Sequence, residues 1–157
     1  EFLSHSSPST SQNEWQLAEV LAGISSVQTA TSEAFVPQML NYESVEGVSF
    51  KKGCYPGQEV VARSQFRGTL KRRAFIVACH SPMQVGQEVF SADDLEQACG
   101  TVASVAENDS RSKEDAAKWW GIVSMQINAA SQVLHLGNPE GPELHLSALP
   151  YPLLEDI

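Results

Sequence analysis

The feature that most constrains the fold of this chain is a change of pattern at Lys71. From there onward, short apolar runs of strand-like composition alternate with turn residues. The six runs are residues 74–79, 87–90, 100–106, 119–127, 132–136 and 143–146. Six short strands at this spacing predict a compact antiparallel barrel or sandwich. Residues 107–118 are charged and lack apolar periodicity, which predicts a surface hairpin loop.

Ahead of Lys71 the sequence predicts short helices. Residues 15–21 form an apolar-periodic segment that stops before Gly23, a residue suited to a helix end. Residues 35–40 predict a short helix or an extended segment, with Pro37 early in it. Residues 57–66 predict a further helix, so the expected fold class is α+β.

The charge of the chain is unevenly distributed. The net charge of the 157 residues is −9, but seven of the ten Lys and Arg residues lie between Lys51 and Arg73, against one acid, Glu59. This segment is therefore +6 and the remainder −15. A concentrated basic patch attracts a localised anion such as a polyglutamyl tail, a phosphate or an RNA backbone. The alternative is a solvated face, or pairing with acids elsewhere in the fold.

The remaining composition argues against several classes of protein. Three separate cysteines without a C-x-x-C pair, and four scattered histidines, indicate neither a disulfide framework nor a metal site. No apolar run is long enough to cross a bilayer, and the first ten residues lack the features of a secretory signal, which predicts a cytoplasmic protein without membrane partners. The Ser-rich start without methionine suggests a piece of a longer protein.

Chemically special residues concentrate at residues 50–63, which read FKKGCYPGQEVVAR. Cys54 comes just before the predicted helix start and beside Lys51 and Lys52. Unpaired N–H groups at a helix start and nearby ammonium groups stabilise a thiolate. Cys54 is therefore the candidate catalytic residue, with Lys52 to lower the pKa of its thiol. The alternative is a small buried residue in a glycine-bounded turn.

The same stretch carries a family resemblance. Residues 52–59, KGCYPGQE, match the signature K-G-C-[FY]-x-G-Q-E of the YgfZ family of folate-binding proteins, which are related to the aminomethyltransferase of the glycine-cleavage system. The flanking stretches agree: AGI at 22–24, FVPQMLN at 35–41, GVSF at 47–50, EVVAR at 59–63, LKRR at 70–73 and LPYPLLE at 149–155. Family members are about twice as long, so the chain resembles their C-terminal half from about Trp15 onward.

The resemblance implies an architecture. Residues 1–70 would form the C-terminal part of a central, aminomethyltransferase-like α+β domain, with a flexible start. Residues 71–157 would form a small terminal antiparallel β-barrel. Most of the wall of the folate site would come from an N-terminal half that is not part of this sequence.

The resemblance also implies a function: a tetrahydrofolate-binding accessory protein that supports iron–sulfur enzymes, including tRNA methylthiotransferases, with possible tRNA contact. Cys54 and Lys52 would be its catalytic pair. The implied folate-binding residues are Lys51, Gly53, Tyr55, Gly57, Gln58, Glu59 and Arg63. Gly53 and Gly57 would let the backbone approach an anion or simply form a turn. Gln58 and Glu59 would bond the pterin or cap the helix.

Two other functions stay open. The first is a folate-dependent aminomethyltransferase or other one-carbon transferase. Residues 19–23 read EVLAG where the aminomethyltransferases read like R-x-E-A-G, so a non-enzymatic accessory role is favoured. The second is an RNA- or protein-binding barrel without a small-molecule ligand, whose RNA affinity would depend strongly on salt.

Overall fold

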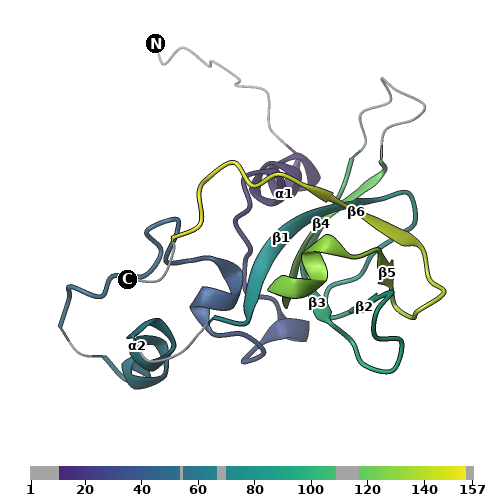
Figure 1. Ribbon diagram of the computed structural model, residues 1–157. Helices are drawn as coiled ribbons and strands as arrows, with labels where there is room; N and C mark the ends of the chain where they lie inside the picture. Colours follow the sequence, from purple (N-terminus) through teal and green to yellow (C-terminus); the bar gives the residue numbers. More distant parts are fainter. Residues whose placement is uncertain (1–10, 54, 67–69, 109–116, 155–157) are drawn as a thin grey trace, which may run out of the picture.

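The computed structural model describes residues 11–53, 55–66, 70–108 and 117–154 (Figure 1). Helical elements come first along the chain, and strands follow. The helical elements are α1 (Gln12–Leu21), η1 (Thr29–Thr31), η2 (Pro37–Leu40), α2 (Gln58–Phe66) and, between strands, η3 (Ile127–Ser131). The strands are β1 (Arg72–Cys79), β2 (Glu88–Ser91), β3 (Gly100–Glu107), β4 (Trp119–Gln126), β5 (Leu134–Leu136) and β6 (Glu143–Ser147).

The six strands close into an antiparallel barrel in the order β1-β4-β3-β2-β5-β6. Strand β1 closes it, because it pairs along its whole length with β4 and at residues 76–78 with β6. Closure leaves no long unpaired strand edge to invite association with another chain. The predicted α+β class with a small antiparallel barrel is confirmed, and each strand lies within one to two residues of its predicted bounds.

Both faces of the long strands are buried. Valines from opposite sides of the barrel, including Val77, Val89 and Val123, fill its interior together with Met125. On the outer face Ile122 and its neighbours pack against Val20 of α1 and Leu40 of η2. Each such fully buried side chain contributes about 1.5–3 kcal/mol. Burial on two faces explains why the strand sequences read as nearly continuous apolar runs.

Helix α1 begins earlier than the periodicity predicted. Ser11 Oγ accepts a hydrogen bond from the backbone N–H of Glu14 (3.2 Å), and the Glu14 carboxylate accepts one from the N–H of Ser11 (2.7 Å). This capping box starts the helix at Gln12, within a polar stretch. The apolar periodicity marks only residues 15–21, because the first three helical residues, at 12–14, are polar.

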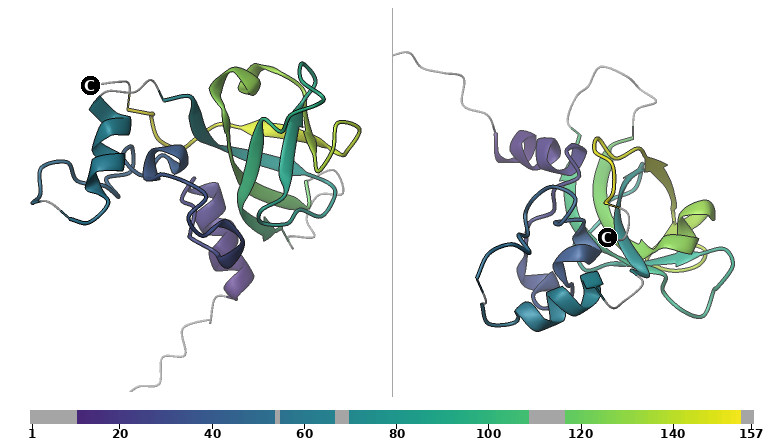
Figure 2. Two further views of the ribbon diagram at one scale, coloured as in Figure 1. Left: turned by 90° about the horizontal axis from the view of Figure 1, so that it is seen from below. Right: turned by 60° about the vertical axis from the view of Figure 1, so that its left-hand side comes forward.

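Helix α1 lies directly on the barrel, whereas α2 lies farther out and contacts η2 (Figure 2). Asn13 of α1 fixes the first contact, since its side chain donates to Glu107 O (2.8 Å) and accepts from Glu107 N (3.2 Å) at the end of β3. Within the described residues, no helix combines the length and the apolar character that crossing a membrane requires.

Candidate functional site

The signature segment forms an exposed turn that leads into α2. Lys51, Lys52 and Gly53 are exposed, and Tyr55 is half-buried. The Lys52 ammonium lies 4.8 Å from the centre of the Tyr55 ring, within the range of a cation–π contact. Cys54 lies outside the described residues, so the activation of its thiol stays a prediction.

The start of α2 is built by Gln58 and Gly57. The Gln58 side-chain oxygen accepts a hydrogen bond from the backbone N–H of Tyr55 (3.2 Å), and the Gln58 N–H donates to Tyr55 O (3.1 Å). Gly57 has φ +83°, a conformation that L side chains avoid, and no atom lies within 4 Å of where its Cβ would be. The Gln58 side chain therefore bonds to the turn just ahead of α2, and Gly57 forms the predicted turn, whereas pterin binding by Gln58 stays a prediction.

Glu59 and Arg63 pair with each other on the surface of α2. Their side chains are 2.6 Å apart at i, i+4 spacing, and they are 81% and 68% exposed. A pair this exposed contributes about 0.3–0.5 kcal/mol in a helix, because water screens it. Glu59 thus offsets much of the positive charge of Arg63 in this structure.

A buried amide attaches α2 to the rest of the molecule. Gln38 of η2 is fully buried, and its Nε2 donates to Val61 O of α2 (2.7 Å). Val61 and Gln65 form the buried side of α2. Since η2 is the main neighbour of α2, the position of the signature turn depends on where η2 lies.

Asn41, the residue that ends η2, attaches this helix to the barrel through hydrogen bonds. Its side chain accepts from Ala74 N (3.1 Å) and donates to Ala74 O (2.8 Å), so it continues the edge of β1 as a strand would. Tyr151 donates to Gly23 O (2.8 Å). Tyr151 Oη also accepts from the Asn41 amide (3.5 Å), and Arg73 donates to Leu154 O (2.8 Å), so the stretches at 22–24, 35–41, 70–73 and 149–154 meet in one network.

Among the described residues, the basic side chains of residues 51–73 do not form a single surface, and Arg67 lies outside the described residues. Arg73 is buried and forms an ion pair with Glu43, which is fully buried, and it also donates to Leu154 O (2.8 Å). For Arg73, the interpretation of pairing with an acid elsewhere in the fold is the correct one, whereas Arg63 pairs with Glu59, the acid of the segment itself. Lys51 and Lys52 lie on the signature turn, and Lys71 and Arg72 lie at the start of β1.

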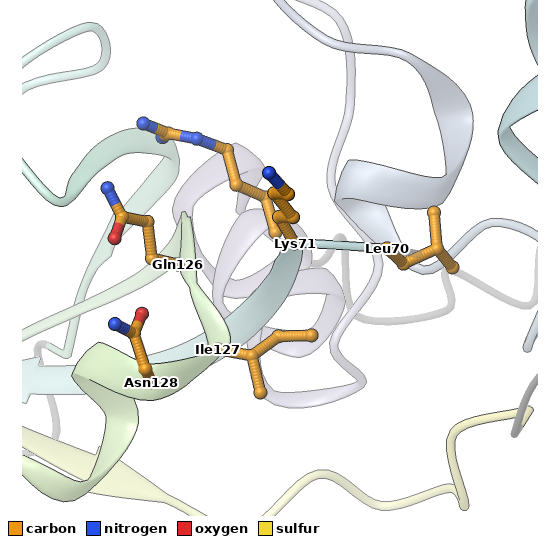
Figure 3. A pocket seen from close by; sticks show the side chains of 6 residues that line it. Leu70, Lys71, Gln126, Ile127 and Asn128 are labelled. Carbon is orange, nitrogen blue, oxygen red and sulfur yellow. The ribbon is translucent and has the colours of Figure 1, made fainter. Parts of the chain in front are cut away.

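Lys71 and Arg72 line a hollow of about 710 Å³ (Figure 3). Its other lining residues are Leu70, Gln126, Ile127 and Asn128. Strand pairing creates it, because Arg72 lies opposite Gln126 in the β1–β4 register and Ile127 N donates to Lys71 O (3.0 Å). The sequence interpretation missed Gln126 and Asn128, and only the register of β1 on β4 would have revealed them.

Neither this hollow nor the two neighbouring ones includes the signature residues in its lining. The second, of about 600 Å³, is mainly apolar and shares Leu70 and Ile127 with the first. The third, of about 130 Å³, shares Gln126 and Asn128 with the first and includes two acids, Asp93 and Asp94. Among the described residues, no group of three His, Cys, Asp or Glu side chains comes together as a metal site would require.

Comparison with known proteins identifies relatives. A tRNA-modifying protein YgfZ from Photobacterium profundum is 43% identical over 86 residues, covering 55% of this chain and 25% of the relative. Proteins of the same name from Sodalis glossinidius and Yersinia pestis are 30% identical over 145 residues and 32% identical over 150. Those alignments cover 90% and 91% of this chain but 43% of each relative, so the chain spans less than half of their length. No family model matches the chain.

Proposed function

Since this chain is homologous to the C-terminal half of the YgfZ proteins, we propose that it belongs to a tetrahydrofolate-binding accessory protein that supports iron–sulfur enzymes, among them enzymes that thiolate tRNA. Relatives named as tRNA-modifying proteins support the tRNA part of this role. Such a role belongs in the cytoplasm, alongside the enzymes it serves.

The observation that carries the proposal is the solvent exposure of the signature turn. Lys51, Lys52 and Gly53 are exposed, on a turn that leads into α2, and α2 contacts η2 more than it contacts any barrel strand. Residues that served only the packing of this chain would be buried against it. The exposed turn supports the view that this surface is completed by the other half of the protein, with folate between the two.

The chemistry of the turn suits an anionic, hydrogen-bonding ligand. Lys51 and Lys52 would attract the glutamate carboxylates of folate. The Gln58 side-chain oxygen accepts a hydrogen bond from the N–H of Tyr55, which orients the Nε2 group of the same amide. This donor would bind an acceptor such as a pterin oxygen. Gly53 has room for a close ligand, since no heavy atom lies within 4 Å of a Cβ built there.

Cys54 would supply the reactive or ligand-handling thiol. It lies between Gly53 and Tyr55, next to the two lysines and just before α2, where positive charge and helix N–H groups favour a thiolate. If the full-length protein with Cys54→Ala left iron–sulfur enzyme activities in cells unchanged, this role of the thiol would be wrong.

The folate site is tested by calorimetric titration of reduced folate. We expect the full-length protein to bind, Lys52→Ala to weaken binding by about tenfold, and the 157-residue chain alone to lose it. Lys118→Ala is the matched control, because Lys118 is exposed on the barrel, pairs with Glu107 and should leave affinity unchanged. Absence of binding by the full-length protein would remove folate from the proposal. Formation of methylene-tetrahydrofolate from an aminomethyl donor would identify a one-carbon transferase instead.

A further inference from the structure

We propose that the hollow at the start of β1 binds one nucleotide of a single-stranded RNA segment. This inference rests on the proposed function, which indicates RNA as the ligand and tRNA as its source. It concerns a different surface from the signature turn, since the hollow is lined by residues 70–72 and 126–128. The argument comes from three kinds of group that meet there: cations, amides and apolar side chains.

The cations of the hollow are available for a phosphate. Lys71 is exposed and Arg72 is half-buried, and neither takes part in an ion pair found among the described residues. Arg63, Arg73 and Lys118, by contrast, each pair with a glutamate. An ammonium and a guanidinium on adjacent residues match the charge and the oxygen geometry of a phosphodiester.

The amides of the hollow suit the edge of a base. In Figure 3 the side chains of Gln126 and Asn128 project to the same side of the chain, while Ile127 projects away from them. In the described structure neither amide group hydrogen-bonds to another residue, whereas the main chain here is fixed by bonds from Gln126 N to Cys99 O (2.9 Å) and from Ile127 N to Lys71 O (3.0 Å). Each amide thus offers donors and an acceptor to the edge of an unpaired base, beside a main chain that these bonds fix.

The apolar residues and the open shape favour a polymer over an enclosed small molecule. Ile127 is 45% exposed and Leu70 half-buried, which leaves apolar surface for a base or ribose to cover. The volume, about 710 Å³, falls in the range of ligand sites, yet Lys71, Ile127 and Asn128 at its rim are exposed. A chain can therefore enter and leave. Asp93 and Asp94 of the adjoining hollow would repel phosphate, so the RNA backbone should follow the Lys71 side.

Base edges are accessible in single strands, whereas duplex RNA hides them in a deep, narrow groove. The test measures anisotropy of a labelled, unmodified tRNA transcript with the full-length protein, and then of a short single-stranded RNA and its duplex. The Lys71→Gln, Arg72→Gln double variant should bind tRNA about ten- to a hundredfold more weakly, with the slope of log K against log salt reduced by about 1.4. The single variant Lys71→Gln, at an exposed position, should reduce the slope by about half as much, about 0.7.

Gln126→Ala with Asn128→Ala should weaken binding by about tenfold and leave the salt slope unchanged, because it removes base contacts and no charge. Lys118→Gln removes an equal charge from another part of the barrel and should have little effect. Equal losses in Lys118→Gln and Lys71→Gln, preference for the duplex, or no RNA binding by the unaltered protein would each overturn the inference. Loss of folate affinity in the hollow variants, with RNA affinity intact, would also overturn it and assign the hollow to folate. Because the signature turn is a different surface, a failure of folate binding would contradict the proposed function without contradicting the RNA site.

Discussion

At the scale of single residues, the Arg73–Glu43 pair is the most consequential interaction. The side chains are only 7% and 0% exposed, so neither charge is solvated by bulk water. Burying two charges is costly, and their attraction repays the cost only while both are present. The pair therefore fixes where the segment just after η2 meets β1 more than it adds net stability.

Glu43→Gln should lower the free energy of unfolding by about 3–5 kcal/mol, because it removes the buried carboxylate that pairs with the Arg73 guanidinium. Urea denaturation measures this. The control, Glu107→Gln, breaks the exposed pair with Lys118 and should cost about 0–1 kcal/mol. Equal effects of the two substitutions would show that the buried pair has no special weight.

The sequence distinguishes poorly between basic residues that look alike. Arg73 and Lys71 belong to the same basic run, yet one is buried with Glu43 and the other lines an open hollow. Glu43 precedes Arg73 by 30 positions, and only the fold brings the two together. A count of charges therefore located the basic residues in the sequence, but it did not show that they separate in space or which of them are available to a ligand.

At the scale of elements, the start of α2 depends on backbone conformation at Gly57. Gly57→Ala should cost about 1–2 kcal/mol of local stability, since alanine at φ +83° brings its Cβ toward the following carbonyl oxygen. The matched control is Gly53→Ala, because Gly53 does not have a positive φ and its Cβ position is equally open. Hydrogen exchange of the α2 amides should rise in the Gly57 variant alone. Faster exchange in both variants would contradict the conformational explanation.

Elements with strong periodicity were predictable, and elements defined by caps or by tertiary contacts were not. The strands stood out because burial on both faces makes them apolar throughout. Helix α1 begins with Gln12, Asn13 and Glu14, whose start is set by Ser11 and not by any apolar pattern. For residues 35–40 the sequence predicts either a short helix or an extended segment, because Asn41 at φ +60° ends η2 through bonds to β1 that local sequence does not encode.

At the scale of the whole molecule, the candidate sites are products of topology. Lys71 and Asn128 are far apart in sequence and share a hollow only because β1 pairs with β4. The signature turn could be found from its residues alone, but its exposure depends on η2 and on Gln38. Sequence therefore predicted the barrel and one surface, whereas the second surface required the register of the sheet.

Two tyrosines hydrogen-bond to the turn that follows α1. Tyr151, near the C-terminus, donates to Gly23 O (2.8 Å), and Tyr42 donates to Ser25 O in the same turn. Burial raises the pKa of both phenols above the ordinary value, and the nearby Glu19 carboxylate raises that of Tyr42 further. Both phenols must stay protonated to donate these bonds.

The alkaline stability of the whole chain should reflect these phenols. Above about pH 10 the unfolded chain releases their protons before the folded chain does, so the free energy of unfolding should fall as pH rises. Tyr151→Phe should cost about 1 kcal/mol near neutral pH through the lost bond to Gly23. It should also make the alkaline decline shallower, so the curves of variant and unaltered chain converge at high pH. Urea midpoints across this pH range measure both effects, and parallel curves would mean that Tyr151 titrates alike in the folded and unfolded chain.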